Sequence, residues 1–287
     1  MPEFTTPEPI TVTASVHSGR LLLLAGDRTT TVVRVLPGDD QAAADVKAAE
    51  QTGVDYTAGV LTVRSPDPNW LSGVLGGSPR VDVTVELPAG SNLRAETVKA
   101  QVRSEGPLDE VRIDGVSGHI HLDRVGALRV DTVSGRVSAD DVVRHADVNG
   151  VSGEVHLGRV GGSGVVKNVN GGIQIGDAGS SLHVSAAGGD IVVERAGPGV
   201  TAKTSAGGIR IGGATTGEIE AVSASGDVEI GVGEGTTAWI DARSTTGSVR
   251  NNLQHQEAPV GQADRVRVRA RSRHGDIMIH RSRRADA

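Results

Sequence analysis

The chain has 287 residues, a formal net charge of −6 and no cysteine, which excludes disulfides, Fe–S clusters and thiol chemistry. Hydrophobic residues make up 37% of the sequence but aromatic residues only 1%, so the core must consist of small aliphatic side chains with few rings. A chain of this length can hold one long domain or two.

The first residues, Met1-Pro2-Glu3-Phe4, lack the basic and apolar regions of a secretory signal peptide. The apolar run Leu21–Leu24 is too short to cross a membrane. We therefore expect a cytoplasmic protein without a membrane span, and an already trimmed, secreted mature form is the alternative.

Residues 1–91 are predicted to form a β-rich segment with one short helix that caps the repeats after it. The helix is expected near Asp39–Thr52, because Asp39 and Asp40 are cap candidates, the body is rich in Ala, and Gly53 ends it. A hairpin is expected to turn at Thr57-Ala58-Gly59. The expected strands are residues 10–14, 21–24, 31–35, 54–56, 60–63 and 81–87.

A glycine recurs about every 18 residues from residue 118 onward, and Ile or Val follows each glycine two residues later. A second apolar residue usually stands four residues after the glycine, and another pair stands seven and five residues before it. Each pair, spaced by two, is the buried face of a short strand. The fixed period indicates a solenoid. These turn glycines are Gly118, Gly135, Gly153, Gly171, Gly189, Gly207, Gly226, Gly247 and Gly275.

Polar residues stand between the apolar columns, so one face of each strand is expected to be buried and the other exposed to solvent. Strands that repeat in one direction stack in parallel on their neighbours. We predict an all-β fold, a single-stranded parallel β-helix (β-solenoid) of about 18 residues per coil over residues 92–281. Ala100 takes the glycine position of a degenerate first coil, and residues 282–287 form a basic tail.

No constellation of residues indicates catalysis. Ser117 and Ser134 belong to a column that precedes the glycines, and we expect their hydroxyls to bond within their own turns. A nucleophile is one residue beside one base, whereas this serine repeats. His119, His121 and His156 share an outer face. His156 lies two coils beyond the other two, at a distance of about 9–10 Å, which is too far for all three to bind one metal ion. The sequence also lacks a phosphate loop and calcium-binding repeats. We expect a protein that is not an enzyme and has no cofactor or metal.

Residues 265–287 contain eight Arg and two Asp, whereas the rest of the chain is acidic. Arg267, Arg269 and Arg271 alternate with inward Val268 and Ala270, so they share one outer face. They either solvate the last coil and repel edge-on stacking, or form a face for an anionic partner. The basic tail after Ile279 is expected to block end-to-end stacking by like-charge repulsion, leaving a monomer or weak dimer. The absence of interleaved aromatic residues disfavours nucleic acid.

The chain resembles the bacterial β-strand-repeat family labelled "putative adhesin", a domain of unknown function. The resemblance implies a β-helix and no established catalysis. The segments that carry it are Asp27-Arg28-Thr29, Ala48–Thr52, Val81–Gly90, the repeated Ser-Gly-x-Val units, Val166-Lys167-Asn168, Ala202-Lys203-Thr204, Val249–Leu253 and Gly275-Asp276-Ile277.

The favoured function is a non-catalytic scaffold that binds an unknown protein or glycan, since a long regular surface lacks any unrepeated polar cluster. One alternative is an enzyme acting on polysaccharide, with outward Trp239 near the insertion 254–262 as a sugar contact. Another is the binding of an anionic polymer or nucleic acid through the basic C-terminal coil.

Overall fold

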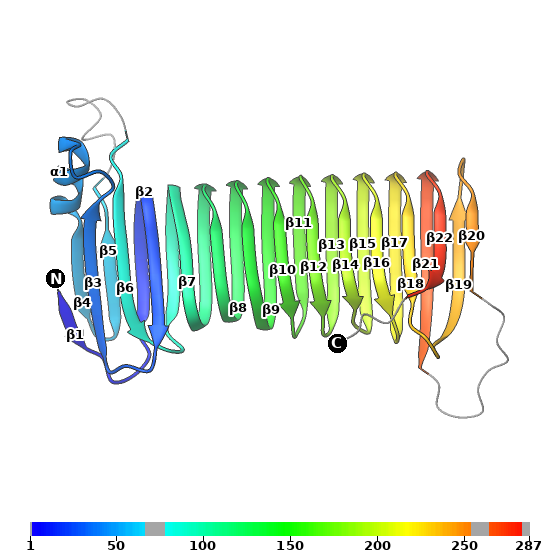
Figure 1. The fold of residues 1–287 in the computed structure, drawn as a ribbon, viewed down its shortest axis with the longest axis horizontal. Coiled ribbons are helices and arrows are strands. Elements are labelled where there is room, and N and C mark those ends of the chain that lie inside the picture. The colour runs from blue at the N-terminus through cyan, green and yellow to red at the C-terminus, as the bar shows by residue number, and fades with distance from the viewer. Residues whose placement is uncertain (1, 67–77, 254–263, 283–287) are drawn as a thin grey trace. The chain divides into compact units, whose positions relative to one another are not determined.

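The protein is nearly all β, with a single short helix among the residues that its computed structural model describes: 2–66, 78–253 and 264–282. The chain divides into two compact units, residues 1–141 and 142–287, and the division falls within strand β9 (Val137–Ser152). In each unit the coils lie side by side (Figure 1). The predicted β-solenoid is confirmed, whereas the domain boundaries expected at residues 91 and 281 stay predictions.

The N-terminal unit contains the expected elements, with two differences in extent and one strand, β1, that was not expected. The stretches 10–14 and 21–24 belong to one continuous strand, and the helix begins at Ala43 instead of near Asp39. The Asp39 carboxylate accepts a hydrogen bond from the Gln41 backbone N–H (3.0 Å), so it closes a turn before the helix and does not cap it. The elements are β1 (Glu3–Thr5), β2 (Thr11–Gly26), β3 (Thr30–Pro37), α1 (Ala43–Gln51), β4 (Gly53–Thr57), β5 (Val60–Arg64), β6 (Val81–Pro88), β7 (Asn92–Ser117) and β8 (Ile120–Ser134).

Strand β2 is itself part of the solenoid. It pairs in parallel with β5 and β6 along one edge and with β7 along the other. Gly19 is the partner of Ala100 and Leu21 is the partner of Val102, which confirms Ala100 in the glycine column. Leu21 and Leu23 follow Gly19 at the spacing of the repeat, but the sequence analysis did not recognise this coil, because β3–β6 separate it in the chain from its neighbour.

The C-terminal unit repeats a coil of two strands. The strands before the glycine turns pair with one another at a register of 18 residues, as Val166 does with Val184 and Val184 with Ala202. The strands after the turns do the same. After β9, the strands of both kinds are β10 (Val155–Val160), β11 (Gly164–Asn170), β12 (Ile173–Ala178), β13 (Ser181–Gly188), β14 (Ile191–Ala196), β15 (Gly199–Ala206), β16 (Ile209–Ala214), β17 (Gly217–Ser225), β18 (Val228–Val232), β19 (Thr237–Ser244), β20 (Val249–Asn251), β21 (Arg265–His274) and β22 (Ile277–Arg281).

The last two coils of this unit are stacked out of chain order. Strand β21 pairs in parallel with β17 on one side and β19 on the other, and β22 lies likewise between β18 and β20 (Figure 1). Side-chain hydrogen bonds follow this order, since the Ser272 hydroxyl donates to the Gly226 carbonyl (3.0 Å) and the Ser244 hydroxyl to the Gly275 carbonyl (2.8 Å). The expectation that residues 265–281 form the terminal coil is therefore wrong. The coil with β19 and β20 lies beyond them, and the 28-residue interval from Gly247 to Gly275 is the sequence signal of this return.

Engineered cysteine pairs test this order in a chain without native cysteine. Glu220 and Arg269 are register partners on adjacent strands, so about 5 Å separates their Cα atoms, within disulfide range. Asp241 is the partner of Arg269 on its other side, about 10 Å from Glu220. We expect Glu220→Cys/Arg269→Cys to form an intramolecular disulfide on mild oxidation and Glu220→Cys/Asp241→Cys to form none, by peptide mass spectrometry. The reverse result would contradict the inserted coil.

Candidate functional site

The outer face of β21 carries a row of arginines. They alternate with Val266, Val268, Ala270 and Ser272, which are buried. The row includes the three arginines of the predicted partner face and extends it at both ends. Its members are Arg265, Arg267, Arg269, Arg271 and Arg273. The alternation was readable in the sequence, and the role of this face in binding stays a prediction.

Side chains of neighbouring strands contact the first half of the row. The Arg267 guanidinium lies over the Trp239 ring, 5.2 Å from its centroid, and an Arg269 nitrogen is 4.0 Å from a Glu218 carboxylate oxygen. Trp239 points outward as expected and is 55% exposed. The insertion 254–262, near which the sequence analysis placed it, lies outside the described residues. This half of the face is occupied by contacts within the unit, because it lies between β17 and β19 and not at the end of the stack.

The Asp241 carboxylate organises the middle of the row. The Arg271 guanidinium donates to it, and donates also to the backbone carbonyls of Asp241 (2.8 Å) and Ala270 (3.1 Å). The hydrogen bond from Arg271 lowers the pKa of Asp241 below its usual 3.8. Arg243 reaches the second carboxylate oxygen at 3.7 Å. One negative charge thus serves two guanidiniums, which leaves a local surplus of positive charge.

A groove of about 710 Å³ opens beside this surplus, over β13, β15, β17, β21 and β19. Four cations and no carboxylate line it. Lys203 has an acid partner outside the lining, Glu220 at 3.3 Å, whereas no ion pair joins Arg273 to an acid within the described part of the chain. The cations are Lys203, Arg243, Arg271 and Arg273.

The groove exists because one outer column changes to small side chains. Two residues before the glycines, the first coils of this unit carry exposed Val151 and Val169. The same column continues as Ala187, Ser205 and Ala224, so the surface recedes where β13, β15 and β17 pass. The sequence contained this switch, but it could not place Arg273 or Arg243 beside it without the order of the coils.

Hydroxyl groups on the groove floor are already bonded to the scaffold. The Thr204 hydroxyl donates to the Gly189 carbonyl (3.3 Å), and the Ser223 hydroxyl donates to the Gly207 carbonyl (3.0 Å). These side chains join each coil to the preceding turn. Ser205 and Thr245 are exposed on the groove walls. A ligand would therefore meet cations and a few accessible hydroxyls above a floor of bonded side chains.

The serines before the glycines form hydrogen bonds across coils. The expectation that they bond within their own turns is wrong. The Ser117 hydroxyl donates to the Val98 carbonyl (2.9 Å), and the Ser134 hydroxyl donates to the Val116 carbonyl (3.3 Å). Each acceptor carbonyl belongs to the preceding coil, 19 residues before Ser117 and 18 residues before Ser134. These hydroxyls therefore join successive coils.

The predicted histidine face offers no metal centre. The Nδ1 atom of His119 accepts from the Arg136 backbone N–H (3.3 Å), and that of His121 lies 2.9 Å from the Ser138 hydroxyl. His156 belongs to the other unit. Across residues 2–66, 78–253 and 264–282, no group of three His, Cys, Asp or Glu side chains could hold a metal ion. Across the same ranges, no helix is long and apolar enough to span a membrane.

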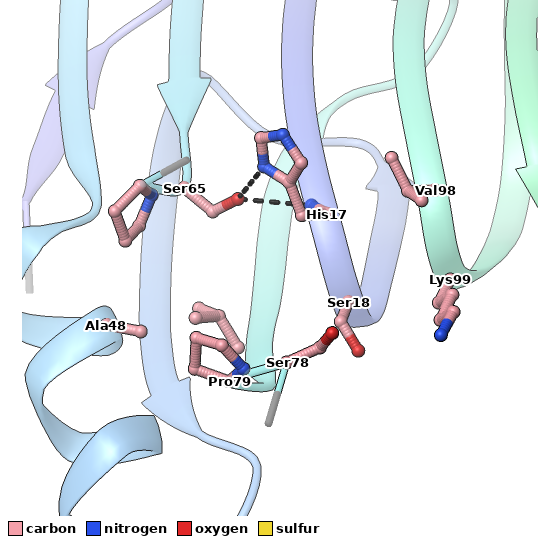
Figure 2. A pocket seen from close by; sticks show the side chains of 10 residues that line it. His17, Ser18, Ala48, Ser65, Ser78, Pro79, Val98 and Lys99 are labelled. Atoms are coloured by element: carbon pink, nitrogen blue, oxygen red, sulfur yellow. Dashed lines mark hydrogen bonds between the residues drawn. The ribbon is translucent and has the colours of Figure 1, made fainter. Parts of the chain in front are cut away.

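A second, smaller cavity lies in the N-terminal unit (Figure 2). Its volume is about 40 Å³, enough for a few water molecules and too little for a substrate. His17 and Ser65 meet in it, with Nδ1 3.2 Å from the hydroxyl, while the same hydroxyl accepts from the His17 backbone N–H (3.1 Å). No carboxylate of the described chain bonds to the imidazole, so the acid of a catalytic triad is missing there.

Comparison with known proteins places these features in a family. A family model described as Toastrack DUF4097 matches residues 8–280. Similar solved structures include a "putative adhesin" from Parabacteroides merdae (12% identity, 97% of this chain and 94% of that chain covered, TM-score 0.40). Another is a "putative lipid binding protein" from Parabacteroides distasonis (12% identity, 96% and 95% covered, TM-score 0.44). No curated protein matches the chain. Since the family model spans nearly the whole sequence, the chain belongs to the Toastrack DUF4097 family.

Proposed function

We propose that this protein is a non-catalytic binding scaffold and that the outer face of β21, with Arg267, Arg269 and Arg271, contacts an anionic partner. The observation that carries the proposal is the row of arginines alternating with buried residues along one strand. Backbone pairing on both sides holds β21 in place, so little ordering is needed when a partner binds. The arginine side chains can form forked hydrogen bonds with carboxylate, sulfate or phosphate groups.

Two cavities in the described part of the chain support binding better than catalysis. The His17–Ser65 cavity is small and lacks a carboxylate at the imidazole. The larger groove contains cations but no carboxylate or histidine that could serve as a general acid or base. Most glycoside hydrolases need a pair of carboxyl groups flanking the scissile bond.

The experiment is capture by the immobilised full chain from a mixture of cell extract and polysaccharides, followed by elution with increasing salt. We expect the wild type to retain an anionic component that salt releases, because screening weakens exposed ion pairs. The variant Arg267→Ala/Arg269→Ala/Arg271→Ala should retain less than about a tenth of it, the loss expected when a few ionic contacts disappear.

A matched control is Arg210→Ala on β16, where the arginine is also exposed and has only a 3.9 Å contact with Glu229. Its capture should equal that of the wild type. Equal capture by the triple variant would remove the β21 face from the proposal. Capture of nothing, together with turnover of a small substrate, would contradict a binding scaffold.

A further inference from the structure

We propose that the groove over β13, β15, β17, β21 and β19 binds an acidic polysaccharide, whose carboxylate or sulfate groups are held by Lys203, Arg243 and Arg273. This inference rests on the proposed binding function and narrows its site. All residues that line the groove belong to the C-terminal unit. The lining carries cations without a carboxylate, so the chemistry of its ligand is anionic.

The cations are spaced for a polymer. Lys203, Val222, Arg271 and Arg243 are successive register partners across β15, β17, β21 and β19. Strands lie about 4.8 Å apart, so about 10 Å separates the backbones at Lys203 and Arg271, and about 14 Å those at Lys203 and Arg243. A single small anion cannot span these distances, whereas a linear chain with regularly repeated charges can contact all of them.

Charge pairing around the groove selects Arg273 and Arg243 as the contacts most available to a ligand. Arg271 is held by Asp241 and by two backbone carbonyls. Arg243 is exposed, and its only ion pair within the described chain is the 3.7 Å contact with that same carboxylate. Arg273 is exposed and has no acid partner there. Ser223 and Ser244 are the register partners of Ser272. The next residues after those two serines, Ala224 and Thr245, are uncharged and stand beside Arg273.

The groove favours a glycan over other polyanions. No aromatic side chain lines it for stacking on bases. Its floor is recessed and its small side chains cannot insert into a bilayer. The exposed hydroxyls of Ser205 and Thr245 can bond to sugar hydroxyls.

The test is titration of the full chain with defined probes, namely polygalacturonate (carboxylated), heparin (sulfated), dextran (neutral) and single-stranded oligothymidylate. We expect binding of one or both acidic polysaccharides, weaker binding of their short oligomers, and no binding of dextran. Arg243→Ala/Arg273→Ala should weaken the acidic polysaccharide at least tenfold. Arg210→Ala, on a strand that does not line the groove, should stay within twofold of the wild type. Thermal melts of each variant identify any loss of folding.

Three results would overturn the inference. They are no binding of either acidic polysaccharide, unchanged binding by the double variant, and binding of oligothymidylate as tight as that of the polysaccharides. The last would assign the groove to nucleic acid. If no polysaccharide binds but the wild type still captures a partner that Arg267→Ala/Arg269→Ala/Arg271→Ala loses, the groove assignment fails and the binding function stands.

Discussion

Replacing Ile173 with Asp is expected to destabilise the protein by roughly 3–5 kcal/mol. Ile173 is buried, with register partners Val155 and Ile191 on the strands beside it, both of which are also buried. A carboxylate there would lie among aliphatic side chains without a hydrogen-bond donor or a counter-charge. The carboxylate would have to be protonated or the coil would have to open, and either change lowers the free energy of unfolding.

The adjacent residue is the control. Gln174 is exposed on the same strand, so Gln174→Asp introduces the same side chain one position along and should change stability by less than about 0.5 kcal/mol. Chemical denaturation with circular dichroism detection measures both variants. Equal stability of the two would contradict the inward and outward assignment that underlies the whole solenoid.

Replacing Gly207 with Ala is expected to cost roughly 2–4 kcal/mol, from backbone strain together with a steric overlap. Gly207 has φ of +143°, a conformation that L side chains rarely adopt. A Cβ there would also overlap the carbonyl oxygen of Gly189 in the preceding coil, and that oxygen is fixed because it accepts from the Thr204 hydroxyl. The chain therefore cannot move aside without separating two coils.

Gly213, on strand β16, is the matched control. Its backbone is not in the positive-φ region, and a Cβ would come no closer than 3.7 Å to the Glu194 carbonyl oxygen. Gly213→Ala should therefore be neutral or slightly stabilising, since Ala restricts the unfolded chain more than Gly does. If both variants have the same melting temperature, the close approach of successive turns does not require glycine at position 207.

Local pattern was sufficient to predict most of the fold. The spacing of Ile173 and Ile175 after Gly171 identified which side chains are buried, because a strand places alternate residues on opposite faces. It failed at β2, where Leu21 and Leu23 follow Gly19 with the same spacing, because a single coil far from the others in sequence has no visible period. The helix start was also misplaced, because an Asp can close a turn as readily as it can cap a helix.

The candidate site was only half predictable. The row that contains Arg267 and Arg269 was evident from alternation alone. The groove was not, because Lys203, Arg243 and Arg273 come from three strands, and their proximity depends on which strand is whose neighbour. The partners of the row, among them Trp239 and Asp241, likewise come from a coil that the chain order places before β21 and the stack places after it.

The sequence by itself determined the period, the buried columns and the glycine turns, because each of these is decided within one coil by strand alternation and backbone sterics. Only the tertiary structure decided the order of the coils. Coils with the same apolar columns can pair with one another in several orders at similar cost, since the ladder joins backbone groups that are alike in every coil. The position of β21 between β17 and β19 follows from the whole unit, and that position gives Arg269 its acidic neighbours and leaves Arg273 without one in the described chain.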